Sequence, residues 1–194
     1  MYPLECRESV RFNNATTVFD NHLVDVFLDN QVIQLALWDT AGQEDYARLR
    51  PLSYPGTDCV LLCYAIDKPT SYDNIESVWM SELKLHCPSV PFLLIGCKTD
   101  LRSDPDTLNR LHSEGRNFVT YQEGVALAQR IGAWRYMECS AKLNEGVGDV
   151  FEFATRAATW SAGKGDNSKA PTTFDGGRPS ESKQSVNSSE HRDK

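Results

Sequence analysis

The segment that decides the fold reads Trp38-Asp39-Thr40-Ala41-Gly42-Gln43-Glu44-Asp45. The apolar run at residues 32–38 predicts a β-strand, and Asp39 stands where that strand ends. A carboxylate at a strand end, followed by a turn on Gly42, is typical of α/β proteins, which hold ligands at the carboxyl ends of their strands. A plain strand-to-turn transition is the alternative interpretation of so short a motif.

Apolar runs elsewhere predict further strands, at residues 23–28, 59–66, 92–97 and 135–139. Asp29-Asn30 supplies a hairpin turn into the strand at residues 32–38. Periodicity predicts helices at residues 73–86, 121–131 and 146–160, and the second begins with a capping box from Thr120 to Glu123. The first helix is expected to bury a face made of Ile75, Val78, Trp79 and Leu83. Because strands and helices alternate, we expect an α/β fold with an open sheet and helices on both faces.

Two later strand ends also carry polar motifs, Cys97-Lys98-Thr99-Asp100 and Cys139-Ser140-Ala141-Lys142. Each alone is a common loop sequence, but their order and their shared position at strand ends favour a single site. Together the three motifs resemble the guanine-nucleotide site of Ras-superfamily small GTPases, which have a P-loop NTPase-like fold. Residues 35–55 resemble the Rho family in particular, and the resemblance covers residues 16–160.

The resemblance implies roles for the residues around Gly42. It implies that Asp39 binds Mg²⁺ through water, that the Gly42 N–H reaches the γ-phosphate of GTP, and that Gln43 orients the attacking water. Two neighbours complete this nucleotide-binding segment, Thr40 and Ala41.

Two segments outside these motifs also have counterparts in the Rho family. Thr17 is similar to the threonine that binds Mg²⁺ and senses the γ-phosphate; a β-branched residue entering a strand is the alternative. The neighbouring effector surface would consist of Val18, Phe19, Asp20 and Asn21. Residues 103–119 resemble the helical insert of Rho proteins, with a generic surface loop as the alternative.

The other two motifs are implied to read the base. Asp100 would accept two hydrogen bonds from guanine, and the stem of Lys98 would cover the ring. Most of the superfamily has asparagine at the position of Cys97, whereas the similar Rnd branch has cysteine. A thiol cannot make the hydrogen bonds of that asparagine. The final loop would contribute Ser140, Ala141 and Lys142.

The phosphate-binding motif G-x-x-x-x-G-K-[ST] is missing from the sequence, in which the first glycine is Gly42. Residues 1–15 form an atypical N-terminal segment, too short for the strand, P-loop and helix that precede the first switch in the family. We therefore expect these elements to be missing or replaced. Their loss would leave a gap in the sheet between the strands at residues 32–38 and 59–66.

The composition of residues 161–194 predicts a disordered tail. The tail ends without the prenylation box of Rho proteins, and its charges nearly cancel, so we expect no direct membrane anchor, although intact family members are membrane-associated through prenylation. The formal net charge of −7 argues against nucleic-acid partners. Six cysteines without a C-x-x-C pair, most of them in apolar strand-like runs, predict free thiols and a cytoplasmic location.

The sequence therefore predicts a Rho-family small GTPase that uses GTP/GDP and Mg²⁺ and works as a switch in signalling, impaired here by the missing P-loop. Effectors, exchange factors and GTPase-activating proteins are the implied partners. One alternative is a nucleotide-free pseudo-GTPase that binds partners through residues 16–21 and 44–55; another is a fragment that does not fold. Whether the missing P-loop is biological or a gene-model error is left open by the sequence.

Overall fold

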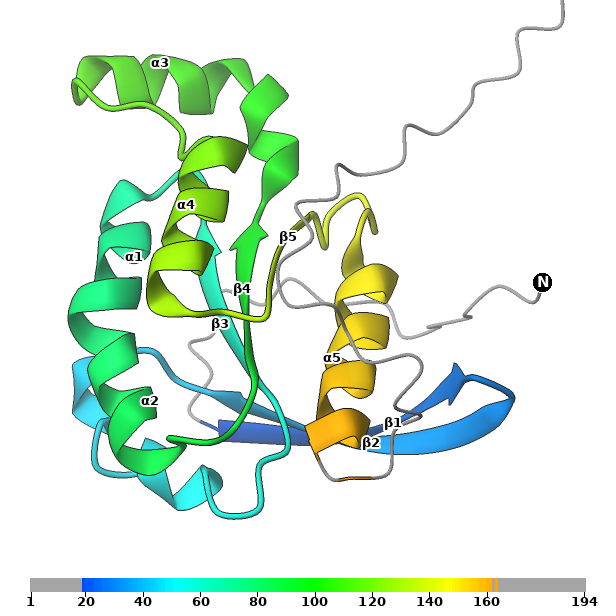
Figure 1. Cartoon of the computed structure of the whole chain (residues 1–194). Coiled ribbons are helices and arrows are strands. Elements are labelled where there is room, and N and C mark those ends of the chain that lie inside the picture. Colours follow the sequence, from blue (N-terminus) through cyan, green and yellow to red (C-terminus); the bar gives the residue numbers. More distant parts are fainter. Residues whose placement is uncertain (1–18, 162, 164–194) are drawn as a thin grey trace, which may run out of the picture.

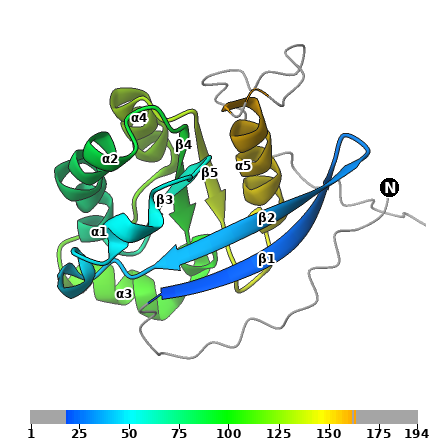
Figure 2. The ribbon, with the colours of Figure 1, turned by 90° about the horizontal axis from the view of Figure 1, so that it is seen from below.

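The strands of the protein fall into two sheets in the computed structural model, which describes residues 19–161 and residue 163. An antiparallel hairpin is formed by β1 (Phe19–Leu28) and β2 (Gln31–Thr40). A parallel sheet contains, in this order, β3 (Val60–Ala65), β4 (Phe92–Cys97) and β5 (Arg135–Cys139). The hairpin runs across one end of the parallel sheet and does not continue it (Figures 1 and 2).

Helices cover both faces of the parallel sheet (Figure 1). One face carries α4 (Tyr121–Ile131) and a helical segment built from α1 (Pro69–Asn74), a π-turn (Ile75–Trp79) and α2 (Met80–His86). The other face carries α5 (Val147–Ser161). α3 (Pro105–Ser113) lies beyond the end of β4, and short 3-10 helices form at Glu44–Tyr46, Arg50–Ser53 and Thr99–Ser103. Within the described part of the chain, no helix has the length and apolarity needed to cross a membrane.

The central strand β4 contributes to an apolar core on each face of the sheet. Leu94 packs toward α2 and α4, whereas its neighbours Leu93 and Ile95 pack toward Val150 and Ala154 of α5. These three side chains of β4 are at most 1% exposed. Since full burial of such a side chain contributes about 1.5–3 kcal/mol, β4 and its neighbours form the most firmly held part of the described structure.

The hairpin, in contrast, buries only one of its faces. Val26 and Leu28 are 5% and 6% exposed, while Leu23 and Phe27 at the alternate positions are 69% and 63% exposed. Its turn has positive φ angles of 48° and 64° at the two residues named in the sequence, Asp29 and Asn30. Two positive φ angles are those of a type I′ turn, so the predicted hairpin is confirmed.

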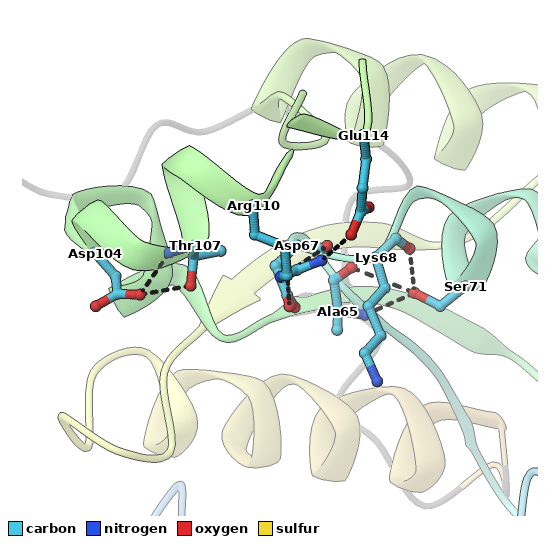
Figure 3. Close-up of polar contacts among 8 residues, drawn as sticks. All are labelled: Ala65, Asp67, Lys68, Ser71, Asp104, Thr107, Arg110 and Glu114. Atoms are coloured by element: carbon cyan, nitrogen blue, oxygen red, sulfur yellow. Dashed lines mark hydrogen bonds and ion pairs between the residues drawn. The ribbon is translucent and has the colours of Figure 1, made fainter. Parts of the chain in front are cut away.

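α3 is attached to the end of β3 by side-chain contacts (Figure 3). Asp104 caps the helix, its Oδ2 accepting hydrogen bonds from the N–H of Thr107 at 3.0 Å and from its Oγ1 at 2.5 Å. These hydrogen bonds lower the pKa of the Asp104 carboxyl. Further along the helix, Arg110 Nη2 donates to Oδ2 of the buried Asp67 at 3.0 Å. A helix therefore forms within residues 103–119, as the sequence predicts.

Most of the predicted elements are confirmed, with shifted ends for some. The strands at residues 92–97 and 135–139, the helix at residues 121–131 and both hydrogen bonds of its capping box are present as predicted. β1 and β2 extend further than expected, β3 is one residue shorter at each end, and α5 is displaced by one residue.

Two expectations are wrong in detail. The helix expected at residues 73–86 begins at Pro69, and Val78, which lies within its π-turn, is 45% exposed and does not join the buried face. Cys63 is exposed, although its apolar strand predicts burial. The described strands form two sheets, with no strand between β2 and β3, which is the gap expected from the missing N-terminal elements.

Candidate functional site

The loops after β4 and β5 come together at the carboxyl ends of these strands. Cys97 and Cys139 are paired in register, so the residues that follow them lie side by side. The Oγ of the fully buried Ser140 donates to Asp100 Oδ1 at 2.6 Å. Lys142 Nζ lies 3.8 Å from Asp100 Oδ2, while most of its side chain remains exposed. The two predicted base-reading motifs therefore form one site, with the Asp100 carboxylate at its centre.

Lys98 turns the chain sharply at the end of β4. Its φ of 66° lies in the left-handed region, which costs a non-glycine residue about 1–3 kcal/mol and persists only where the surroundings enforce it. The 3-10 helix Thr99–Ser103 follows directly and includes Asp100. Strained backbone of this kind concentrates at ligand sites, which agrees with the role predicted for this loop.

A buried polar network that the sequence analysis missed ties the two base-reading loops together. Arg102 donates from Nη1 and Nη2 to the two carboxylate oxygens of Glu138, at 2.6 and 2.7 Å. Tyr136 donates to Glu138 Oε1 at 2.6 Å and shares a hydrogen bond of 2.7 Å with Tyr64. Burial and the neighbouring Tyr64 raise the pKa of Tyr136, so its hydroxyl stays protonated. Arg102 follows the first loop directly and Glu138 precedes the second.

A glycine in α4 supports this network by allowing a close approach. A Cβ added to Gly124 would lie 2.1 Å from Cζ of Tyr136, where no side chain fits. Gly124 therefore lets α4 pack directly onto the Tyr136 ring. In the sequence, the glycine inside a helical pattern and the glutamate inside a strand were the two available signals of this network.

The thiol of Cys97, which lies beside that of Cys139 at this site, remains neutral. Cys139 lowers the pKa of the Cys97 thiol, but hydrogen bonding with Cys63 and burial outweigh that effect and raise it to about 12. Cys97 therefore offers only a weak donor where the resembling proteins mostly have asparagine.

The Asp39–Gln43 segment is held by a different network. Arg50 donates from Nη1 to the carbonyl oxygen of Ala41 at 2.5 Å and from Nε to Glu82 Oε1 at 2.6 Å. Tyr54 donates to the same Glu82 oxygen. Arg50 and Glu82 are both largely buried, and the Arg50 guanidinium also lies over the Trp79 ring, 4.7 Å from its centroid. The segment is thereby attached to α2.

Gly42 has no structural reason of its own to be glycine. Its φ is not in the left-handed region, and an added Cβ would meet the Trp79 side chain at an ordinary 3.7 Å. The side chains of Asp39 and Gln43 beside it are exposed. A glycine that neither the backbone nor the packing requires is consistent with a close approach by a ligand.

The structure does not bring all three predicted motifs together. In Figure 1 the hairpin lies at the lower end of the parallel sheet, whereas the loops after β4 and β5 lie at the upper end. Asp39 and Gly42 border a cavity that also includes Asp58 and Cys59, which stand at the amino end of β3. The expectation of a single site for all three motifs is therefore wrong for this conformation, because the hairpin is not aligned with β3.

The remaining predicted residues lie at or before the start of β1. Thr17 and Val18 lie outside the described residues. Phe19 begins β1 opposite Thr40, so this end of the predicted effector surface belongs to a strand. Asp20 and Asn21 are exposed, and Asp20 accepts a hydrogen bond from the N–H of Asn21 at 2.9 Å.

Comparisons with known proteins place the chain in a family. A model of the Ras family matches residues 8–159. The chain is 55% identical to GTP-binding protein rho5 of Schizosaccharomyces pombe over 142 residues, which are 73% of this chain and 71% of that protein. It is 56% identical to rho1 of the same yeast over 142 residues, 73% and 70% of the two chains. It is 53% identical to RHO1 of Saccharomyces cerevisiae over 154 residues, 79% and 73% of the two chains. The chain therefore belongs to the Ras family and, within it, to the Rho-family small GTPases.

Proposed function

We propose that the protein is a guanine-nucleotide-dependent switch, which binds GTP and hydrolyses it as a member of the Rho family. The observation that carries the proposal is the pairing of the two base-reading loops around Asp100. Its carboxylate is oriented by the hydrogen bond from Ser140 at 2.6 Å and faces the exposed Lys142. Guanine presents two neighbouring donors, N1–H and the exocyclic amine, and a carboxylate accepts from both. Adenine does not offer this pair of donors.

The Asp39–Gln43 segment would contact the phosphates and the attacking water. Asp39 has an exposed carboxylate, the hard oxygen ligand that Mg²⁺ prefers, and Mg²⁺ usually binds one or two carboxylates together with nucleotide phosphates. We propose that Asp39 and Thr17 hold Mg²⁺, which when bound would neutralise phosphate charge. Gln43 would orient the attacking water. In the described conformation this segment lies far from Asp100, so hydrolysis requires β2 to move toward the base-reading loops.

Binding is expected to be weak in the 194-residue chain. Backbone N–H groups and the lysine of a P-loop normally supply most of the recognition of the β- and γ-phosphates, and the sequence contains no such motif. The base-reading loops alone contribute a smaller part of the affinity. Rho effectors, exchange factors and GTPase-activating proteins are the partners that we propose for the complete switch.

A second candidate function is a nucleotide-free module that binds partner proteins. Two observations favour it, namely the missing phosphate motif and the separation of the Asp39–Gln43 segment from Asp100. Leu49 and Leu52, in the segment at residues 44–55 that the sequence assigns to partner binding, are also largely exposed. Exposed apolar side chains that lie close together are typical of interaction surfaces.

The two candidates are separated by titrating the chain with fluorescent derivatives of GTP and of xanthosine triphosphate. Asp100→Asn places an amide donor opposite the guanine amine, a mismatch that costs roughly 1–3 kcal/mol, so the variant should bind GTP about 5- to 150-fold more weakly and favour xanthosine triphosphate. Asp106→Asn, the same change at an exposed position of α3, is the matched control. An unchanged preference in the Asp100 variant removes this residue from a base site, and absence of binding by every variant favours the nucleotide-free module.

A further inference from the structure

A row of three residues crosses the parallel sheet just before the base-reading loops. Tyr64 of β3, Gly96 of β4 and Glu138 of β5 are paired in register. A Cβ added to Gly96 would lie 2.7 Å from the hydroxyl oxygen of Tyr136. It would also lie 3.3 Å from the hydroxyl oxygen of Tyr64 and from Cγ of Glu138. The missing side chain of Gly96 therefore leaves, over the middle strand, the space that these polar groups occupy.

The hydroxyl of Tyr136 joins two parts of this network. It donates to Glu138 Oε1 at 2.6 Å, so it accepts the hydrogen bond of 2.7 Å that it shares with Tyr64. The Glu138 side chain is only 10% exposed, and a buried carboxylate is costly unless hydrogen-bond donors surround it. Its oxygens accept from Arg102 and from Tyr136. Glu138 therefore depends on the Tyr136 hydroxyl as well as on the arginine.

The 3-10 helix Thr99–Ser103 is held to the end of β5 at two points. The first is the hydrogen bond of 2.6 Å from Ser140 to Asp100. The second, two residues away on each segment, is the pair of hydrogen bonds from Arg102 to Glu138. A single contact leaves the Asp100 carboxylate free to pivot, whereas a forked arginine–carboxylate pair fixes an orientation as well as a distance. The Arg102 pair therefore determines the direction in which Asp100 points.

Recognition of guanine depends on that direction. The Asp100 carboxylate would accept from two neighbouring donors, N1–H and the exocyclic amine, and hydrogen bonds weaken steeply when their angles depart from linear. A carboxylate that turns out of the plane of the base therefore cannot accept from both donors. Hypoxanthine has the N1–H but lacks the amine. The preference for guanine over hypoxanthine consequently measures how well Asp100 is oriented.

We propose that Tyr136 is a positioning residue that sets the selectivity of the site for guanine. Its hydroxyl holds Glu138, which in turn holds Arg102 and with it the helix that carries Asp100. Tyr136 is 5% exposed, so it acts through these neighbours and does not contact the base. The proposal rests on the proposed function, because the orientation of Asp100 has this role only if Asp100 binds the base.

The probes are guanosine monophosphate (GMP) and inosine monophosphate (IMP), each titrated into the nitrogen-15-labelled full chain. Both lack the β- and γ-phosphates, so the comparison does not require a P-loop. Amide chemical shifts at residues 98–102 and 140–143 locate the binding and give the two dissociation constants. We expect the unchanged chain to bind GMP at least about fivefold more tightly than IMP, because the exocyclic amine adds a hydrogen bond to a charged acceptor.

Two tyrosine variants form a matched pair. Tyr136→Phe and Tyr64→Phe each remove one buried hydroxyl and break the same hydrogen bond between the two rings. Only Tyr136→Phe also removes the donor to Glu138. We expect the preference for GMP over IMP to fall at least about threefold in Tyr136→Phe and to stay nearly unchanged in Tyr64→Phe. A role confined to fold stability would affect both variants alike.

A second pair of variants tests the same link from the arginine side. Arg102→Lys keeps the positive charge, but an ammonium cannot form the forked pair with Glu138, so the preference for GMP should fall here as well. Arg130→Lys makes the same change in the surface pair with Glu76 and should leave the preference unchanged. If the amide spectrum shows that Tyr136→Phe does not fold, Arg102→Lys decides the question.

Three results would overturn the proposal. An unchanged preference for GMP in both Tyr136→Phe and Arg102→Lys would show that the network does not direct Asp100. An equal loss of preference in Tyr136→Phe and Tyr64→Phe would assign the two hydroxyls to the stability of the fold alone. Both results leave the base site itself standing. Absence of GMP-induced shifts at residues 98–102 in the unchanged chain would instead overturn the proposed base site, and this inference with it.

Discussion

The base-reading loops and the Asp39–Gln43 segment differ in how the fold holds them. The loops follow β4 and β5, whose backbones are paired in register and covered by helices on both faces. The Asp39–Gln43 segment follows a hairpin that is buried on one face and joined to the rest through Arg50 and a few contacts with α5. The difference teaches that the base side of the site is built into the parallel sheet, whereas the phosphate side depends on where the hairpin lies.

The largest expected effect comes from breaking the network beneath the base-reading loops. Arg102→Met removes both hydrogen bonds to Glu138, a largely buried carboxylate, and leaves that charge without its cation. We expect the free energy of unfolding to fall by about 3 kcal/mol. Urea denaturation of the chain and the variant, monitored by circular dichroism, gives the difference.

The control is an ion pair of the same type on the surface. Arg130→Met breaks the pair with Glu76, in which both side chains are about half exposed, and should lower the free energy of unfolding much less than Arg102→Met does. Equal costs for the two variants would contradict the view that the Arg102 network holds together the parallel half of the molecule, that is, the sheet of β3, β4 and β5 with its helices.

The sequence predicts this half well and the other half less well, for physical reasons. Strand β4 and helix α4 are specified locally, by a continuous apolar run and by a capping box with helical periodicity, so both were predicted with their observed bounds. The pairing of Asp100 with Ser140 follows from register, since parallel strands end at one edge of a sheet.

The position of the hairpin is a long-range property that no local pattern specifies. Its turn and register are encoded by Asp29-Asn30 and by the alternation of apolar residues, but its angle to β3 depends on a strand that the described residues do not contain. The π-turn at Ile75–Trp79 was missed for a related reason: helical periodicity assumes a constant turn, so one wider turn displaces Val78 from the predicted face.

The second prediction separates the two sides of the nucleotide site. Gln43→Leu should slow GTP hydrolysis by at least about tenfold and leave the affinity for GTP within about twofold, because its side chain positions water in the transition state. Asp100→Asn, in contrast, should lower the affinity for GTP. Single-turnover hydrolysis with Mg²⁺ is the measurement, and Gln129→Leu, at an exposed position of α4, is the control. Equal hydrolysis rates for the chain and its Gln43 variant would remove Gln43 from the proposed mechanism.

The third prediction concerns how the stabilisation of α4 by Glu123 depends on pH. Hydrogen bonds from the N–H and Oγ1 of Thr120 lower the pKa of the Glu123 carboxyl below its ordinary value. A carboxyl with a lowered folded-state pKa stabilises the fold above its ordinary pKa of about 4.3, and the contribution is lost as the pH falls through the folded value. Glu123→Ala should therefore cost about 1 kcal/mol at pH 7 and less at pH 3.

Glu123→Gln is the matched control for this titration. Glutamine also completes a capping box but carries no titrating charge, so its contribution should not change between pH 7 and pH 3. Denaturation of the three proteins at both pH values gives the comparison. A cost of Glu123→Ala that is the same at pH 3 as at pH 7 would show that the ionised carboxylate is not what stabilises α4.

The smallest expected effect concerns the ion pair that ties the hairpin turn to α5. Arg156 Nη1 donates to Asp29 Oδ2 at 3.0 Å, but both side chains are partly exposed, and Arg156 also pairs with Glu152 within its own helix. A double-mutant cycle with Asp29→Asn and Arg156→Met should give a coupling of about 0.5 kcal/mol that decreases with salt. Asparagine tolerates the left-handed backbone of the turn, so the first variant removes charge without disturbing the hairpin. A coupling of several times this value would mean that the hairpin is fixed in its observed position, and that the phosphate side of the site is held as firmly as the base side.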